Sequence, residues 1–205
     1  MLKKRSRINI TLACVYILPV IGFFLRFVML LTPTKFNPLM YSLYIILFFL
    51  GVLGASFVLF FIIAILKMDS GFSLKKQTLL TLFYATIIFI IINLPGAIII
   101  DETTNWNPLF SWNFFIIFYF FFSLLIVAPY IVLSIKLYYQ FRDEILRRKL
   151  IQFFFGFLGM ALGFYGLTLY NTWDNEFFKI GWNIFGLVLL LLSGISIYYG
   201  TIQYV

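Results

Sequence analysis

Four polar or aromatic residues are candidates to contact a small ligand. They are Arg26, Asn93, Trp106 and Trp112. Arg26 lies inside the apolar run 8–31, where a charged group is costly and commonly functional, so it is a candidate contact for a ligand or an anion. Its position near the end of that run also lets the guanidinium reach the interface or pair with an acid outside the helix.

Asn93 precedes Pro95 inside the apolar run 78–100, and together they predict a kinked helix. Proline removes one backbone hydrogen bond and clashes with the carbonyl four residues earlier. The Asn93 amide can bond to that carbonyl region, to another helix or to a substrate. Pro129 predicts a similar kink in the run 112–135.

The chain lacks the side chains for most enzymatic chemistry. It contains no histidine and a single cysteine, Cys14. These counts exclude His-ligated metals and haem, Ser-His and Cys-His catalysis, and an internal disulfide. Because no acid, base and nucleophile set can be assembled, we expect a protein that is not an enzyme, with no catalytic residue, metal or cofactor.

Four glycines in the apolar run 150–170 share one helix face because they are three and four residues apart. They are Gly156, Gly159, Gly163 and Gly166. A face without side chains lets a neighbouring helix approach closely, so we expect these to be helix-packing residues. The partner helix belongs either to the same chain, which we favour, or to a second copy.

The connection 138–149 is the most polar part of the chain. Asp143 lies one helical turn before Arg147, and Glu144 one turn before Arg148, which predicts a short helical extension with two ion pairs. The segment is interpreted either as an anchor against anionic lipid headgroups or as a docking surface for a cytoplasmic partner. Its candidate contact residues are Arg142, Arg147, Arg148 and Lys149.

Membrane helices are the elements that must position all of these residues. The chain is 63% hydrophobic and 11% charged, whereas soluble domains are about half apolar and about a quarter charged. Six runs reach the roughly 20 residues that cross a bilayer. They are 8–31, 39–66, 78–100, 112–135, 150–170 and 180–199. The sequence therefore predicts an all-α, polytopic membrane protein, a bundle of six transmembrane helices forming one transmembrane domain over 1–205.

Positive charges set the expected orientation of the bundle. Of the 15 Lys and Arg residues, twelve lie before the first run, between the second and third, or between the fourth and fifth. Since cytoplasmic loops carry the excess of positive charge, we expect both termini in the cytoplasm and a multi-pass protein of the cell membrane, surrounded by lipid. Basic residues confined to short loops do not indicate a nucleic acid partner.

The region 134–199 resembles the last part of the multi-span membrane input region of archaeal and bacterial sensor histidine kinases. The resemblance rests on Lys136-Leu137-Tyr138-Tyr139, on Arg142-Asp143-Glu144 with Arg147-Arg148, and on a glycine-bearing span from Gly156. In that family the membrane part feeds a PAS or kinase module. No such module lies within these 205 residues, so the resemblance implies output through a separate cytoplasmic protein.

Three functions fit these observations. The first is a non-enzymatic, sensor-like module that binds a small or lipophilic ligand and passes a helix shift to a cytoplasmic signalling protein. The second is a small-solute transporter or substrate-capture component. The third is a structural subunit that contacts another membrane subunit.

Overall fold

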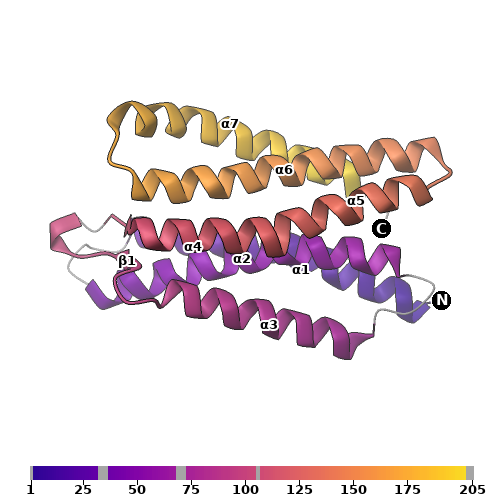
Figure 1. Cartoon of the computed structure of the whole chain (residues 1–205), viewed down its shortest axis with the longest axis horizontal. Coiled ribbons are helices and arrows are strands. Elements are labelled where there is room, and N and C mark those ends of the chain that lie inside the picture. The colour runs from indigo at the N-terminus through magenta and orange to yellow at the C-terminus, as the bar shows by residue number, and fades with distance from the viewer. Residues whose placement is uncertain (1, 32–36, 68–72, 105–106, 202–205) are drawn as a thin grey trace. The chain divides into compact units, whose positions relative to one another are not determined.

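The computed structural model describes residues 2–31, 37–67, 73–104 and 107–201, and most of them are α-helical (Figure 1). The α-helices are α1 (Leu2–Leu31), α2 (Asn37–Leu66), α3 (Leu74–Ile92), α4 (Trp112–Phe122), α5 (Ala128–Gln140), α6 (Glu144–Thr172) and α7 (Glu176–Thr201). The shorter elements are β1 (Ile98–Ile99), the 3-10 turn η1 (Glu102–Thr104), β2 (Leu109–Phe110) and the π-helical turn η2 (Ser123–Val127).

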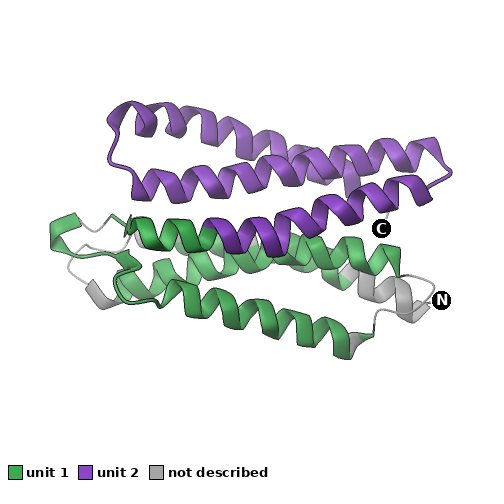
Figure 2. Cartoon of the chain, in the orientation of Figure 1, with its two compact units in different colours: residues 1–118 green, residues 119–205 purple. Residues whose placement is uncertain are grey.

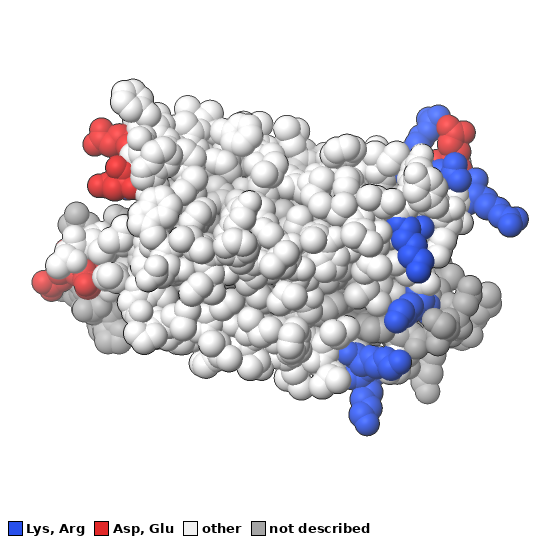
Figure 3. Space-filling model, in the orientation of Figure 1, with Lys and Arg blue, Asp and Glu red and all other residues white. Residues whose placement is uncertain are grey.

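Helices long and apolar enough to cross a membrane make up most of the described chain. There are five among the described residues: Leu39–Leu66, Lys75–Ile92, Trp112–Gln140, Glu144–Thr172 and Glu176–Thr201. Within α1 the apolar helical stretch is shorter, Ile10–Gly22. In the view of Figure 3, the charged side chains of the described residues lie near helix ends, and the surface between them carries none. The chain is an all-α membrane protein, as its composition predicts.

The chain divides into two compact units, residues 1–118 and residues 119–205 (Figure 2). In the first unit α2 packs against both α1 and α3. Its central side chains are fully buried, among them Val52, Ala55, Val58, Phe60, Phe61 and Ile62. A helix that is covered on several sides is apolar all round, which accounts for the long uninterrupted apolar run of α2. That residues 1–205 form a single transmembrane domain stays a prediction.

An aromatic cluster around Phe48 of α2 joins three elements of the first unit. Its ring centroid lies 5.6 Å from that of Phe110, 5.8 Å from that of Phe114 and 5.3 Å from that of Phe118. Edge-on and tilted ring pairs of this kind contribute about 0.5–1.5 kcal/mol beyond the area that they bury. The cluster therefore fixes β2 and the start of α4 on α2.

The kinked helix predicted over 78–100 is wrong, because α3 ends at Ile92. Leu94, Pro95, Gly96 and Ala97 form a turn in which the Ala97 N–H donates to the Leu94 carbonyl, 2.9 Å away. Gly96 has φ of +67°, a left-handed conformation that glycine adopts at little cost. Proline and then glycine at the two central positions are typical of a type II turn. The proline therefore stops the helix instead of bending it.

A short antiparallel hairpin follows this turn. Ile98 pairs with Phe110 and Ile99 with Leu109. Because successive side chains of a strand point to opposite faces, the first pair is buried and the second is exposed. The apolar residues 98–100, which the sequence analysis assigned to the third span, form this strand and its end.

The span Trp112–Gln140 contains a π-helical turn just before Pro129. In an α-helix the Leu125 carbonyl would receive an N–H from residue 129, and proline has none. In η2 the helix widens, and the Ala128 N–H donates to the Ser123 carbonyl five residues earlier. Where the sequence predicted a kink at Pro129, the structure has a wider turn within a span that runs from α4 through η2 into α5.

In the second unit α6 and α7 form a long helical hairpin (Figure 1). The glycines of α6 face α7. A Cβ added at Gly156 would lie 2.8 Å from the Ile197 N and 2.9 Å from the Ser193 O. Added at Gly159 it would meet the Ser193 hydroxyl, and at Gly166 the Trp182 ring. Within the described residues this face is therefore covered by α7 of the same chain.

Candidate functional site

Two of the four candidate ligand contacts lie outside what the structure describes. Trp106 is not among the described residues. Arg26 is part of α1, but the structure does not describe its side chain. Whether the Arg26 guanidinium contacts a ligand, or instead reaches the interface or pairs with an acid outside the helix, stays a prediction.

Asn93 and Trp112 are described, and both are engaged locally. Asn93 is the C-cap residue of α3, and its Nδ2 donates to the Phe89 carbonyl at 2.8 Å. The same carbonyl also accepts the Asn93 backbone N–H at 3.2 Å, so the amide is bound within its own helix. Trp112 is the first residue of α4, is 52% exposed, and packs edge-on against Phe115. An exposed indole at a helix end suits the membrane interface.

Sequence analysis missed a cluster of hydroxyl groups beside the π-helical turn of the second unit. Ser123 Oγ and Tyr165 OH lie 2.6 Å apart and share a hydrogen bond between η2 and α6. The Tyr119 ring lies 5.0 Å from the Tyr165 ring, and its side chain is exposed. We call Tyr119, Ser123 and Tyr165 the hydroxyl cluster. The only hint in the sequence is a serine within an apolar run ahead of Pro129.

Two turns beyond Ser123, Tyr130 holds α5 against α6. Its ring centroid lies 4.0 Å from that of Phe157, and its hydroxyl donates to the Phe153 carbonyl at 3.2 Å. Ser134, on the same face of α5, is buried and its hydroxyl has no hydrogen-bond partner among the described residues. The span therefore makes polar contacts with α6 at the start of η2, through Ser123, and beyond η2, through Tyr130.

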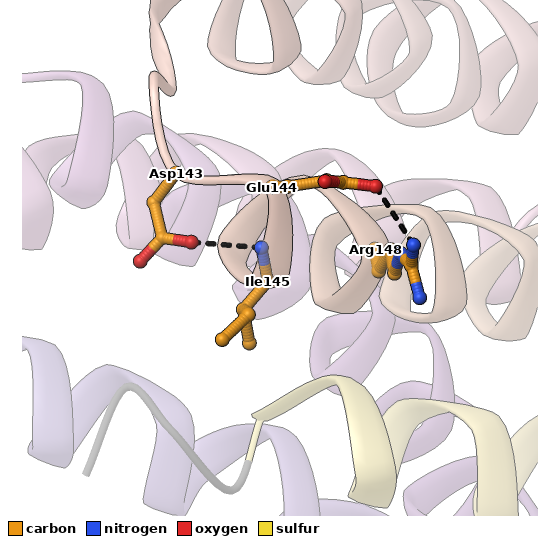
Figure 4. Close-up of polar contacts among 4 residues, drawn as sticks. All are labelled: Asp143, Glu144, Ile145 and Arg148. Atoms are coloured by element: carbon orange, nitrogen blue, oxygen red, sulfur yellow. Dashed lines mark hydrogen bonds and ion pairs between the residues drawn. The ribbon is translucent and has the colours of Figure 1, made fainter.

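The connection between α5 and α6 is a short turn that Asp143 ends. Its carboxylate accepts from the Ile145 N–H at 2.8 Å, as an N-cap residue does, and Figure 4 shows it pointing at that group. Glu144 and Arg148 form the predicted ion pair, 2.7 Å apart and largely exposed. The predicted pair between Asp143 and Arg147 is wrong, because Asp143 is committed to the cap.

Arg147 and Lys149 are instead tied to backbone carbonyls. The Arg147 Nε donates to the Phe141 carbonyl at 2.7 Å, and its guanidinium carbon lies 5.4 Å from the centre of the Tyr138 ring. The Lys149 Nζ donates to the Tyr199 carbonyl at 2.9 Å, which fastens the start of α6 to the end of α7. Arg142 is exposed. Of the four predicted contact residues, Arg142 and Arg148 are therefore the ones presented to solvent.

Two carboxylates outside the helical spans are held in the charged form. The pKa of Asp101 is lowered, mainly by the hydrogen bond from the Thr103 hydroxyl, which lies 2.6 Å away. The pKa of Asp174 is lowered by the hydrogen bond and the charge of Lys179. No group of three or more His, Cys, Asp or Glu side chains in the described part of the chain is placed to hold a metal ion. Asp101 and Asp174 therefore stabilise the loops in which they lie, through their bonds to Thr103 and Lys179.

Comparison with protein-family models, with characterised proteins and with solved structures returned no match to this chain.

Proposed function

We propose that the chain is a non-enzymatic, sensor-like membrane module that binds a small lipophilic ligand and passes a helix shift to a cytoplasmic signalling protein. We further propose that it crosses the cell membrane six times with both termini in the cytoplasm. The distribution of positive charge described above supports this orientation. The observation that carries the sensor proposal is the π-helical turn η2, which lies beside the hydroxyl cluster and leads directly into α5.

The hydroxyl cluster is the proposed ligand end. Hydrogen-bonding groups within an apolar span have no competing water, so a lipophilic molecule with one polar group can exchange bonds with them. Tyr119 is exposed along the span, where lipid-dissolved molecules can reach it. The Ser123–Tyr165 bond joins η2 to α6, and a ligand that replaces this bond changes how the two helices are held.

The π-helical turn is the proposed moving part. Its backbone hydrogen bond reaches five residues back instead of four, and such turns occur frequently at functional sites. Returning to α-helical geometry would rotate α5 relative to α4. Because Tyr130 ties α5 to α6 beyond the turn, that rotation is passed to α6 as well.

The α5–α6 turn is the proposed output. Asp143, Arg147 and Lys149 make it stiff, while Arg142 and Arg148 remain exposed to a partner. A shift of α5 therefore moves a rigid, positively charged surface. An acidic cytoplasmic protein can bind this surface through charge complementarity, and its binding changes when the surface moves.

The test places a fluorescent reporter at the output and perturbs the ligand end. Arg142→Cys is labelled with an environment-sensitive dye in a Cys14→Ser background, which removes the only other cysteine. Tyr165→Phe removes the bond to Ser123, so we expect the dye spectrum to change. Ser193→Ala is the control, because its hydroxyl donates to the Leu189 carbonyl inside α7. Identical dye spectra for the parent and for Tyr165→Phe would contradict the proposal.

A further inference from the structure

The α5–α6 turn carries more positive charge than its own acids neutralise. Residues 136–149 contain five basic and two acidic side chains. Asp143 caps α6 and Glu144 pairs with Arg148. The surplus therefore belongs to the remaining cations, which are Lys136, Arg142, Arg147 and Lys149.

Arg147 is held in place without being neutralised. Its Nε donates to the Phe141 carbonyl, and the guanidinium lies over the Tyr138 ring. This uses one of its five N–H donors. Among the described residues the two terminal nitrogens have no acceptor and no acid pairs with this side chain. A half-buried guanidinium with its stem fixed is a preorganised fork for two oxygens of one phosphate.

The turn lies where a span meets the headgroup region. Val132 and Ile135 of α5 are exposed apolar side chains and face lipid when the helix is inserted. Tyr139, one turn beyond Ile135, is 76% exposed, and tyrosines at helix ends sit at the level of the headgroups. When the chain is inserted, we therefore expect Arg147, which lies over the ring of Tyr138, at the depth of the lipid phosphates.

We propose that Arg147 binds the phosphate of an anionic phospholipid. The stacked and tethered guanidinium supplies a bidentate contact, and the unneutralised cations of the turn favour a lipid with net negative charge. Arg148 does not take part, because its charge is paired with Glu144. This inference depends on insertion of the chain into a membrane and is independent of the sensor proposal.

The test measures lipid binding by native mass spectrometry of the full chain in mild detergent. Phosphatidylglycerol and phosphatidylcholine are added separately at matched concentrations, and we expect retention of phosphatidylglycerol. Arg147→Gln should lower its affinity about tenfold, the effect of losing a charge-assisted contact. Arg147→Lys keeps the charge but loses the fork and should lose most of the affinity. Arg148→Gln is the matched control and should stay within about twofold.

Three results would overturn the proposal. An equal loss of phosphatidylglycerol affinity in Arg147→Gln and Arg148→Gln would mean that the lipid is attracted by the overall charge of the turn and not by a site at Arg147. Equal retention of phosphatidylcholine would remove the preference for anionic lipid. Displacement of phosphatidylglycerol by excess inorganic phosphate would assign the site to a free anion.

Circular dichroism and elution volume check that each variant folds. Where Arg147→Gln does not fold, Tyr138→Leu provides the same test, because it keeps the cation and removes the ring on which it stacks. Affinity should then fall severalfold, and unchanged affinity in this variant would equally overturn the proposal.

Discussion

Adding one methyl group at Gly156 should destabilise the α6–α7 hairpin. The new Cβ would lie 2.8 Å from the Ile197 N and 2.9 Å from the Ser193 O, whereas ordinary contacts begin at 3.4 Å. The Ile197 Cγ1 also lies 2.8 Å from this position and can move with its side chain, but the other two obstructing atoms are backbone, so α7 must retreat by about half an ångström. Overpacking of this kind costs about 1–3 kcal/mol. The better helix propensity of alanine returns about 0.5–1 kcal/mol. We therefore expect Gly156→Ala to lose up to about 2.5 kcal/mol of unfolding free energy, the overpacking cost less this gain.

The assay is reversible unfolding in mixed detergent micelles, followed by far-ultraviolet circular dichroism. Gly194→Ala in α7 is the matched control, because a Cβ there meets no atom within 4 Å. That variant should be as stable as the parent or more stable by up to about 1 kcal/mol. The reasoning is refuted by a Gly156→Ala protein whose free energy of unfolding equals that of Gly194→Ala.

Three further predictions concern single polar contacts. The Gln77 Nε2 donates to the buried Thr11 hydroxyl at 2.9 Å, so Gln77→Leu should lower the free energy of unfolding by about 1 kcal/mol in the same assay. Glu144→Gln should change it by less than about 0.5 kcal/mol, because the ion pair with Arg148 is largely exposed, and a larger loss would contradict this. The lowered pKa of Asp101 stabilises its turn above the usual carboxylate pKa, and this contribution should be lost as the pH falls through the lowered value. Hydrogen exchange of the amides in residues 101–104 measures this contribution. Exchange rates that change with pH only as the intrinsic chemical rate does would contradict the prediction.

The membrane helices were predictable because lipid imposes their length and polarity. Runs of about 20 apolar residues have one main use in a chain this poor in charge. The pair of Glu144 and Arg148 was predictable for a similar reason, since helical spacing alone brings them together. Both inferences depend on local geometry only.

The end of α3 shows where counting apolar residues fails. Ile98 and its neighbours look like a continuing span, but Pro95 and Gly96 impose a turn before them. Proline followed by glycine is itself a turn signal. A local preference also explains Asp143. Its short side chain accepts a backbone N–H in the first turn of α6 and so does not pair with Arg147.

Contacts between helices could not be predicted. Whether Ser123 meets Tyr165 depends on how α6 is rotated about its axis, and a single sequence does not determine that rotation. The stacking of Arg147 on Tyr138 depends likewise on the path of the turn between two helices. Candidate residues chosen by type alone, such as Asn93, therefore proved to be engaged within their own helix.

The most direct test of the account is to label the two ends of α3 from one side of the membrane. Single cysteines replace Lys75 and, separately, Asp101 in the Cys14→Ser background, and intact cells are treated with a membrane-impermeant maleimide. We predict labelling at position 101 and none at position 75 until the cells are opened. Equal labelling at both positions in intact cells would contradict the claim that α3 crosses the membrane.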